Sequence, residues 1–172
     1  MQLAALAGVG KIIVLTSNTS AAELKSYGAT HIIDRHQKPE EIKTKIHEIV
    51  GDDLVYVFDP ISHDSTLGVS ILSSTKRGKV AGLLPATVDA SKIGEKKQGY
   101  DIEFINTPRI LTEDLGRVFY AELPHWLETG KIKPLGYKVV EGGLNADGVN
   151  KVLDDHRDGK FPGKYHVHVN QS

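Results

Sequence analysis

The sequence predicts an α/β fold built around a mainly parallel sheet. Short apolar runs rich in valine and isoleucine alternate with longer segments whose apolar residues recur at helical spacing, and this alternation continues to about residue 110. The first run, Lys11 to Thr16 (KIIVLT), is continuously apolar, which is typical of a strand covered on both faces. Strands and helices that alternate in this way indicate βα units, and therefore a sheet with helices on both faces.

Local signals support each element of the first part of the chain. The expected elements, in order, are a helix at 20–27, a strand at 30–34, a helix at 39–50, a strand at 54–59, a helix at 63–74, a strand at 78–84 and a strand at 102–106. Gly28 and Gly51 follow the first two helices as end signals, and Pro39 suits the first turn of the second helix. These signals predict successive βα units.

The remainder of the chain has a different pattern. Beyond Pro108 we expect a long helix at 113–129, a strand at 137–141, a helix at 146–157 and an alternating strand at 165–169. The polar stretch 85–100 is the most linker-like part of the sequence. Gln2 to Ala7 consists of good helix formers but is far shorter than the roughly 12 residues of a stable isolated helix. We therefore interpret it as the end of a helix.

The composition limits the classes of function. Lys and Arg number 21 against 22 Asp and Glu, so no strong field favours nucleic acid or an anionic membrane. The chain has no cysteine, which excludes disulfides, thiolate zinc sites and cysteine nucleophiles within it. No apolar run approaches the roughly 20 residues that cross a bilayer, and no basic leader precedes the first one. We expect a cytoplasmic protein that has no membrane contact.

Seven segments together carry a resemblance to a known family. They are QLAALAG, KIIVLTSN, LKSYGATHIIDR, VYVFDPIS, GKVAGLLP, LPHWLETGKIKP and EGGLNADGVNKVLDDHRDGKFPGKYHVHV. In this order and spacing they resemble zinc-independent medium-chain dehydrogenases/reductases, which are alcohol dehydrogenase-like oxidoreductases. The quinone-oxidoreductase-like and polyketide trans-enoyl-reductase-like members are the most similar. The resemblance implies a Rossmann-like nucleotide-binding domain at 1–134 and a C-terminal segment, 135–172, that in the family packs on a GroES-like domain.

The resemblance also implies a truncated domain. In the family a GroES-like domain, the first Rossmann strand and its glycine-rich loop precede the segment that matches Met1 onward. We therefore expect an incomplete Rossmann-like parallel sheet that lacks the usual first strand. The strand order 3-2-1-4-5-6 places that strand between those at 11–16 and 54–59. These two must close up, accept a strand from another chain or leave open edges. The expected partner is a further copy of the chain, as a homo-oligomer, or a missing N-terminal half.

The residues after the first strand are the candidates for cofactor binding. In the family an acidic residue there holds the ribose of NAD, whereas small polar residues leave room for the 2′-phosphate of NADP. Arginine stands after the second strand, where many relatives have tyrosine, and could pair with phosphate directly. The cofactor-binding candidates are Ser17, Asn18, Thr19, Ser20 and Arg35. The alternative interpretation is that the polar residues only cap the helix that follows.

Other arrangements of reactive side chains suggest no chemistry. His166 and His168 would share one face of a strand, but two ligands alone do not make a metal site. Ser62, His63 and Asp64 form only a local tripeptide, and adjacent residues point in different directions. We therefore assign no catalytic residue and no metal ligand, and we expect no zinc.

The resulting hypothesis is a truncated relative or a fragment of an NADPH-dependent enoyl or quinone reductase. In the complete enzyme hydride would pass from the nicotinamide to a small-molecule substrate. We expect this chain alone to be inactive, with NADP binding weak or lost. Two alternatives stay open. The chain could be a recruited non-enzymatic protein that binds a protein, a nucleic acid or a glycan, although its charge does not indicate nucleic acid. It could also be half of a split reductase.

Overall fold

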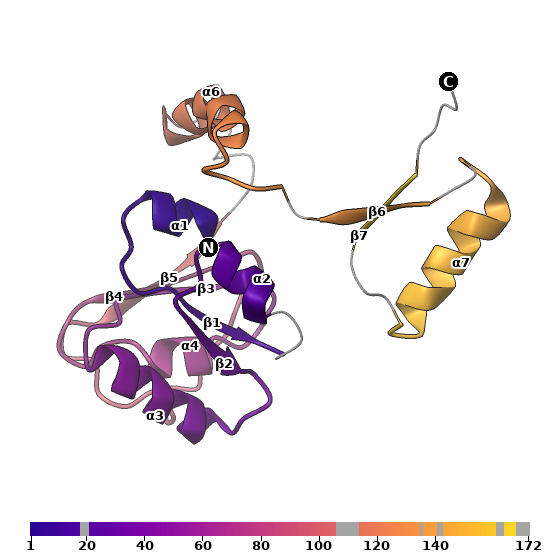
Figure 1. Ribbon diagram of the computed structural model, residues 1–172. Helices are drawn as coiled ribbons and strands as arrows, with labels where there is room; N and C mark the ends of the chain where they lie inside the picture. The colour runs from indigo at the N-terminus through magenta and orange to yellow at the C-terminus, as the bar shows by residue number, and fades with distance from the viewer. Residues whose placement is uncertain (18–20, 106–113, 135, 141–142, 161–163, 168–172) are drawn as a thin grey trace. The chain divides into compact units, whose positions relative to one another are not determined.

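The computed structural model describes residues 1–17, 21–105, 114–134, 136–140, 143–160 and 164–167. The chain divides into two compact units, Met1–Ile132 and Lys133–Ser172. Figure 1 traces the course of the chain through both. Within the described residues, no helix is long and apolar enough to cross a membrane.

The first unit contains two parallel sheets. β1 (Ile13–Thr16) pairs with β2 (His31–Asp34), and β3 (Tyr56–Asp59), β4 (Gly78–Gly82) and β5 (Tyr100–Phe104) form the second sheet in that order. This confirms the α/β class and the parallel pairing. Among the described strands, β1 and β3 are not paired with each other. Of the three arrangements expected for these two strands, closing up is therefore not found among the described residues.

Helices α1 (Gln2–Leu6), α2 (Ala21–Ser26) and α3 (Pro39–Val50) belong to the same unit as these sheets. α2 and α3 lie on opposite sides of the β1–β2 sheet (Figure 1). α3 has the predicted bounds, because Pro39 opens it and Gly51, at φ +60°, ends it. The long helix α6 (Asp114–Glu128) also forms close to where the pattern predicts it.

The helix predicted at 63–74 is shorter in the structure, where α4 spans only Thr66–Ser70. The residues after it bind a distant carboxylate instead of extending the helix. Asp52 accepts hydrogen bonds from the Ser74 N–H at 2.6 Å and from the Thr75 hydroxyl at 2.6 Å. The Ser73 N–H donates to the Leu54 carbonyl at 2.7 Å instead of to a helical carbonyl, and Asp52 binds the residues that follow, so the helix does not extend to Ser74.

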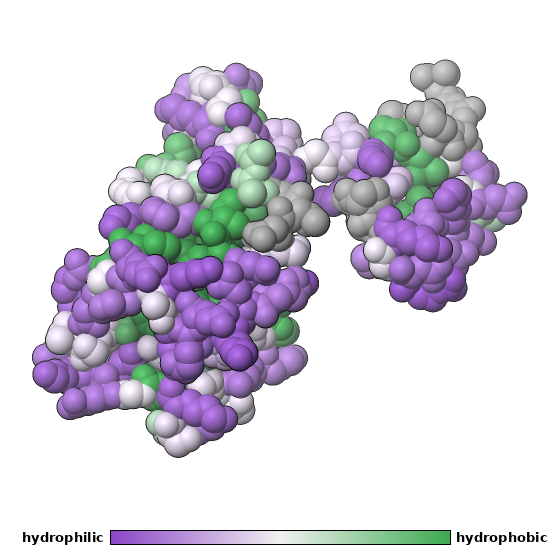
Figure 2. All heavy atoms as spheres, turned by 60° about the horizontal axis from the view of Figure 1, so that its bottom comes forward, coloured by the Kyte–Doolittle hydropathy of each residue, from purple (hydrophilic) through white to green (hydrophobic). Residues whose placement is uncertain are grey.

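Two apolar clusters form the core of the first unit. Ile33, Ile42 and Ile46 join β2 to α3, and Val69, Leu72 and Val80 join the α4 region to β4. The polar stretch 85–100 is not a linker, because its Val88 and Ile93 pack on the second cluster. On β3, alternate side chains stay exposed: Tyr56 is 75% and Phe58 60% accessible. Figure 2 shows apolar side chains gathered in a band on the surface of this unit.

The second unit is a single βαβ arrangement. β6 (Tyr137–Val140) and β7 (Lys164–Val167) are parallel, and α7 (Ala146–Arg157) lies between them in the chain. The Asn145 side chain caps α7 by accepting a hydrogen bond from the Gly148 N–H at 2.7 Å. The bounds of α7 match the sequence prediction, while part of the strand predicted at 165–169 lies outside the described residues.

Candidate functional site

The carboxyl ends of β1 and β2 form the candidate cofactor site. Thr16 lies opposite Asp34 in the ladder, and the Arg35 N–H donates to the Thr16 carbonyl at 3.0 Å. Because both strands point the same way, the residue after each strand emerges at one edge of the sheet. The structure therefore brings the neighbourhoods of Ser17 and Arg35 together. The other three predicted cofactor residues, Asn18, Thr19 and Ser20, lie outside the described residues.

The two charged side chains at this end of the sheet, Asp34 and Arg35, differ in whether they have a bonding partner. The Asp34 carboxylate accepts from the His36 N–H at 3.0 Å and contacts the His36 Nδ1 at 2.8 Å. These two hydrogen bonds, the backbone one first, hold the pKa of Asp34 below its ordinary value. Arg35 is exposed and forms no ion pair with any described residue. At this end of the sheet the Asp34 carboxylate is therefore bonded to His36, whereas the Arg35 guanidinium has no ion-pair partner among the described residues.

The carboxyl ends of β3 and β4 pack tightly against each other. A Cβ atom placed on Gly82 would lie 2.8 Å from the Asp59 carbonyl oxygen, so the backbone approach requires glycine. The Asp59 side chain turns back and accepts the N–H groups of Ile61 and Ser62 at 3.3 and 3.1 Å. This part of the edge is therefore defined by backbone contacts.

The tripeptide Ser62-His63-Asp64 belongs to the loops at this edge. The His63 Nδ1 contacts the Pro85 carbonyl at 3.1 Å, and the His63 carbonyl accepts the Thr87 N–H at 2.9 Å. The Asp64 carboxylate accepts the Thr66 N–H at 2.9 Å. Hydrogen bonds from the Thr66 side chain and backbone lower the pKa of Asp64. The tripeptide thus joins the loops after β3 and β4 and begins α4.

Only one of the two histidines considered as a metal pair lies in the described residues. The His166 ring stacks on Tyr137, with centroids 4.1 Å apart and planes 9° apart, while His168 lies outside the described residues. The residues that the structure describes contain no group of three or more His, Asp or Glu side chains that could hold a metal ion.

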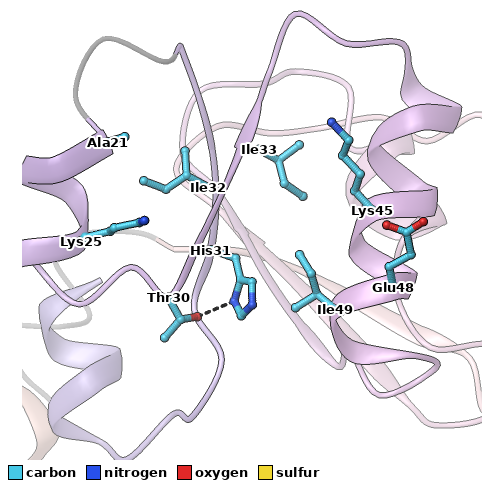
Figure 3. Close-up of a pocket in the computed structure, with 9 residues that line it drawn as sticks. All are labelled: Ala21, Lys25, Thr30, His31, Ile32, Ile33, Lys45, Glu48 and Ile49. Atoms are coloured by element: carbon cyan, nitrogen blue, oxygen red, sulfur yellow. Dashed lines mark hydrogen bonds between the residues drawn. The ribbon is translucent and has the colours of Figure 1, made fainter.

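A groove lies along β2, apart from the candidate cofactor site. It has a volume of about 560 Å³ and is lined by Ala21, Lys25, Thr30, His31, Ile32, Ile33, Lys45, Glu48 and Ile49 (Figure 3). Neither of the described cofactor candidates, Ser17 and Arg35, is among the residues that line it. The sequence pattern did not indicate this groove, because its two lysines lie on different helices and have no motif in common.

Comparison with known proteins supports the fold. The sequence model of the zinc-binding dehydrogenase family matches residues 1–88. No curated protein matches the chain.

Solved structures are similar over almost the whole chain. A quinone oxidoreductase from Pseudomonas syringae pv. tomato has a TM-score of 0.69 at 20% identity. The match covers 95% of this chain and 50% of the quinone oxidoreductase. A mycobacterial protein solved in complex with NADPH has a TM-score of 0.68 at 20% identity, with the same coverage. The CurK enoyl reductase has a TM-score of 0.63 at 19% identity, with coverage of 95% and 48%. The expected resemblance is confirmed, and the chain spans about half the length of these structures.

Proposed function

Because the chain belongs to the zinc-binding dehydrogenase family, we propose that it supplies the NADP-binding part of a reductase for enones or quinones. Similar folds in an enoyl reductase and a quinone oxidoreductase support the substrate class. A similar structure in complex with NADPH supports the cofactor. The parallel strands ending at one edge are the arrangement in which α/β proteins bind nucleotides.

The observation that carries the proposal is the position of Arg35 beside the end of β1. Its N–H is bonded to the Thr16 carbonyl, which brings the start of the second loop next to Ser17. An enzyme selective for NAD places a carboxylate after the equivalent strand, where it binds the ribose hydroxyls. Here the residue is Ser17, and the loop beside it starts with Arg35, whose side chain is exposed and forms no ion pair with a described residue. A serine hydroxyl and an arginine without an ion-pair partner are the groups that suit a 2′-phosphate.

Among the described residues, Ser17 and Arg35 are those we propose for the adenosine end of the cofactor. When bound, NADPH supplies the hydride from its nicotinamide ring. Arg35 can approach a phosphate with two parallel N–H groups, a geometry that lysine does not offer. The Asp34 carboxylate, held by His36, is directed into its own turn and so leaves the phosphate position to Arg35.

A titration of the isolated protein with NADPH, and with NADH as the control, tests the proposal. We expect NADPH binding that is weak but measurable at high cofactor concentration, and weaker binding of NADH at the same salt concentration. Because the chain spans about half the length of the similar structures, we expect no turnover of an enone or a quinone by these 172 residues. Equal affinity for both cofactors would contradict the role of Arg35 in binding the 2′-phosphate. Turnover at ordinary enzyme rates would contradict the proposal that this chain supplies only the cofactor-binding part of a reductase.

A further inference from the structure

The outer edge of β2 has no strand beside it among the described residues. On the inner edge, the N–H groups of His31 and Arg35 donate to the carbonyls of Ile12 and Thr16 on the β1 side. Successive N–H groups of a strand point in opposite directions, so the N–H groups of Ile32 and Asp34 face outward. The edge therefore presents backbone hydrogen-bonding groups that no described strand uses.

Two helices form the walls of a groove along this edge. The groove, which we call the β2 groove, consists of the nine residues drawn in Figure 3. Ile33 is 4% exposed and packs on Ile42 and Ile46 of α3, so its side chain lies on the α3 face of the sheet. Neighbouring side chains alternate between faces, and Ile32 accordingly lies on the α2 face (Figure 3). The edge is thus accessible between two different walls.

Two lysines and one carboxylate line the β2 groove. The pKa of Asp34 at the end of β2 is lowered first by its hydrogen bonds to His36 and further by the charge of Lys45. Lys25 lies on the α2 wall and Lys45 on the α3 wall, on opposite sides of β2 (Figure 3). Both are exposed, and neither forms an ion pair with a described residue. The neighbouring Lys43, by contrast, is paired with Glu40 at 2.9 Å. Glu48 is the single carboxylate among the residues that line the groove.

We propose that the β2 groove binds an extended acidic segment of a partner protein, which adds to the edge of β2 as a further strand. Strand addition uses the outward backbone groups for affinity and the flanking side chains for specificity. Four residues of such a segment would extend about 13 Å, which matches the four-residue length of β2. The inference rests on the sheet edge and does not depend on the cofactor proposal.

The positions of the two lysines specify the pattern of the partner segment. Side chains of adjacent residues in an added strand would face opposite walls. Two consecutive acidic residues would therefore place one carboxylate toward Lys25 and the other toward Lys45. A segment with a central Glu-Glu or Asp-Glu pair and β-branched neighbours fits both the charge and the extended backbone.

A fluorescent eight-residue peptide with a central Glu-Glu pair flanked by valine and threonine is the probe. We expect saturable binding that weakens as salt is raised, because the lysines are exposed. Lys25→Glu and Lys45→Glu should each weaken binding about three- to tenfold. Lys97→Glu is the matched control, because Lys97 is an exposed lysine of the same unit that does not line the groove. An equal loss for Lys97→Glu would overturn the site.

A second probe separates strand addition from general attraction of charge. Two versions of the peptide, N-methylated at the odd or at the even residues, keep their carboxylates, and one of the two loses the backbone donors that face β2. One version should therefore lose binding to the unsubstituted protein, and undiminished binding of both would overturn the proposal without any variant having to fold. The mass of the protein in solution is the third measurement and shows whether the chain self-associates. Self-association that Lys25→Glu abolishes would assign the groove to a second copy and overturn the partner assignment.

Discussion

The N–H of Arg35 donates a hydrogen bond to the carbonyl of Thr16 at 3.0 Å. This bond continues the β1–β2 ladder one step beyond Asp34 and holds the start of one loop against the end of the other strand. As a result, Arg35 and the serine that follows Thr16 both start from the same end of the sheet although they are far apart in the chain. The cofactor predictions depend on this relationship.

Replacing the guanidinium tests its role with NADPH. Arg35→Ala should weaken NADPH binding by about 10- to 150-fold, since a hydrogen bond to a charged group contributes roughly 1.5–3 kcal/mol. NADH affinity should hardly change, because NADH lacks the 2′-phosphate. Calorimetric titration of both cofactors measures the difference. Lys38→Ala, which removes another exposed cation just before α3, serves as the control and should leave the ratio unchanged.

A carboxylate at the end of β1 should reverse the preference. Ser17→Asp would place a negative charge where NAD-binding proteins hold the ribose hydroxyls. We expect NADPH binding to fall at least about tenfold through repulsion of the phosphate, and NADH binding to rise. Competition between the two cofactors at low salt measures the change. A variant that loses affinity for both to the same extent would show that Ser17 has only a structural role.

The contact between β3 and β4 should make Gly82 sensitive to substitution. In Gly82→Ala the added carbon would meet the Asp59 carbonyl oxygen at 2.8 Å, so the backbone must shift. Overpacking of this kind lowers the free energy of unfolding by about 1–3 kcal/mol. Urea denaturation measures it. Gly10→Ala is the control, because a Cβ atom at Gly10 would have no atom within 4 Å; an equal loss at both sites would refute the steric explanation.

Asp52 should contribute to stability in a pH-dependent way. The hydrogen bond from the Ser74 N–H and that from the Thr75 hydroxyl hold the pKa of Asp52 well below its ordinary value of about 3.9. A carboxyl whose pKa is lower in the folded state stabilises that state above the unfolded pKa, and this stabilisation is lost as the pH falls toward the folded pKa. The stabilisation by Asp52 should therefore be complete near pH 7 and decline below about pH 4.

Asp52→Asn provides the measurement. Its unfolding free energy should be lower than that of the original protein at pH 7, and the difference should shrink as the pH is lowered from about 4 to 2. Asp53→Asn is the control, because Asp53 forms only an exposed ion pair with Lys76. A difference that stays constant over this range would show that the charge of Asp52 is unimportant.

Local signals in the sequence were sufficient wherever the structure depends on neighbouring residues. Pro39 and Gly51 predict both ends of α3, because a proline suits the first turn and a glycine adopts the positive φ that follows the last. The parallel α/β class follows from the alternation of apolar runs with amphipathic segments. The cofactor candidates Ser17 and Arg35 came instead from the resemblance to the family, and their role stays a prediction.

The sequence by itself thus determined the fold class and the order of the elements. Only the tertiary structure decided the length of α4, because the Ser73 N–H bonds to Leu54 of another loop, and the lack of pairing between the described strands β1 and β3, because strand pairing is non-local. It alone also placed Lys25 and Lys45 on opposite walls of one groove. Periodicity reports which face of an element is buried, whereas the contacts between elements distant in the chain arise only when the sheet is assembled.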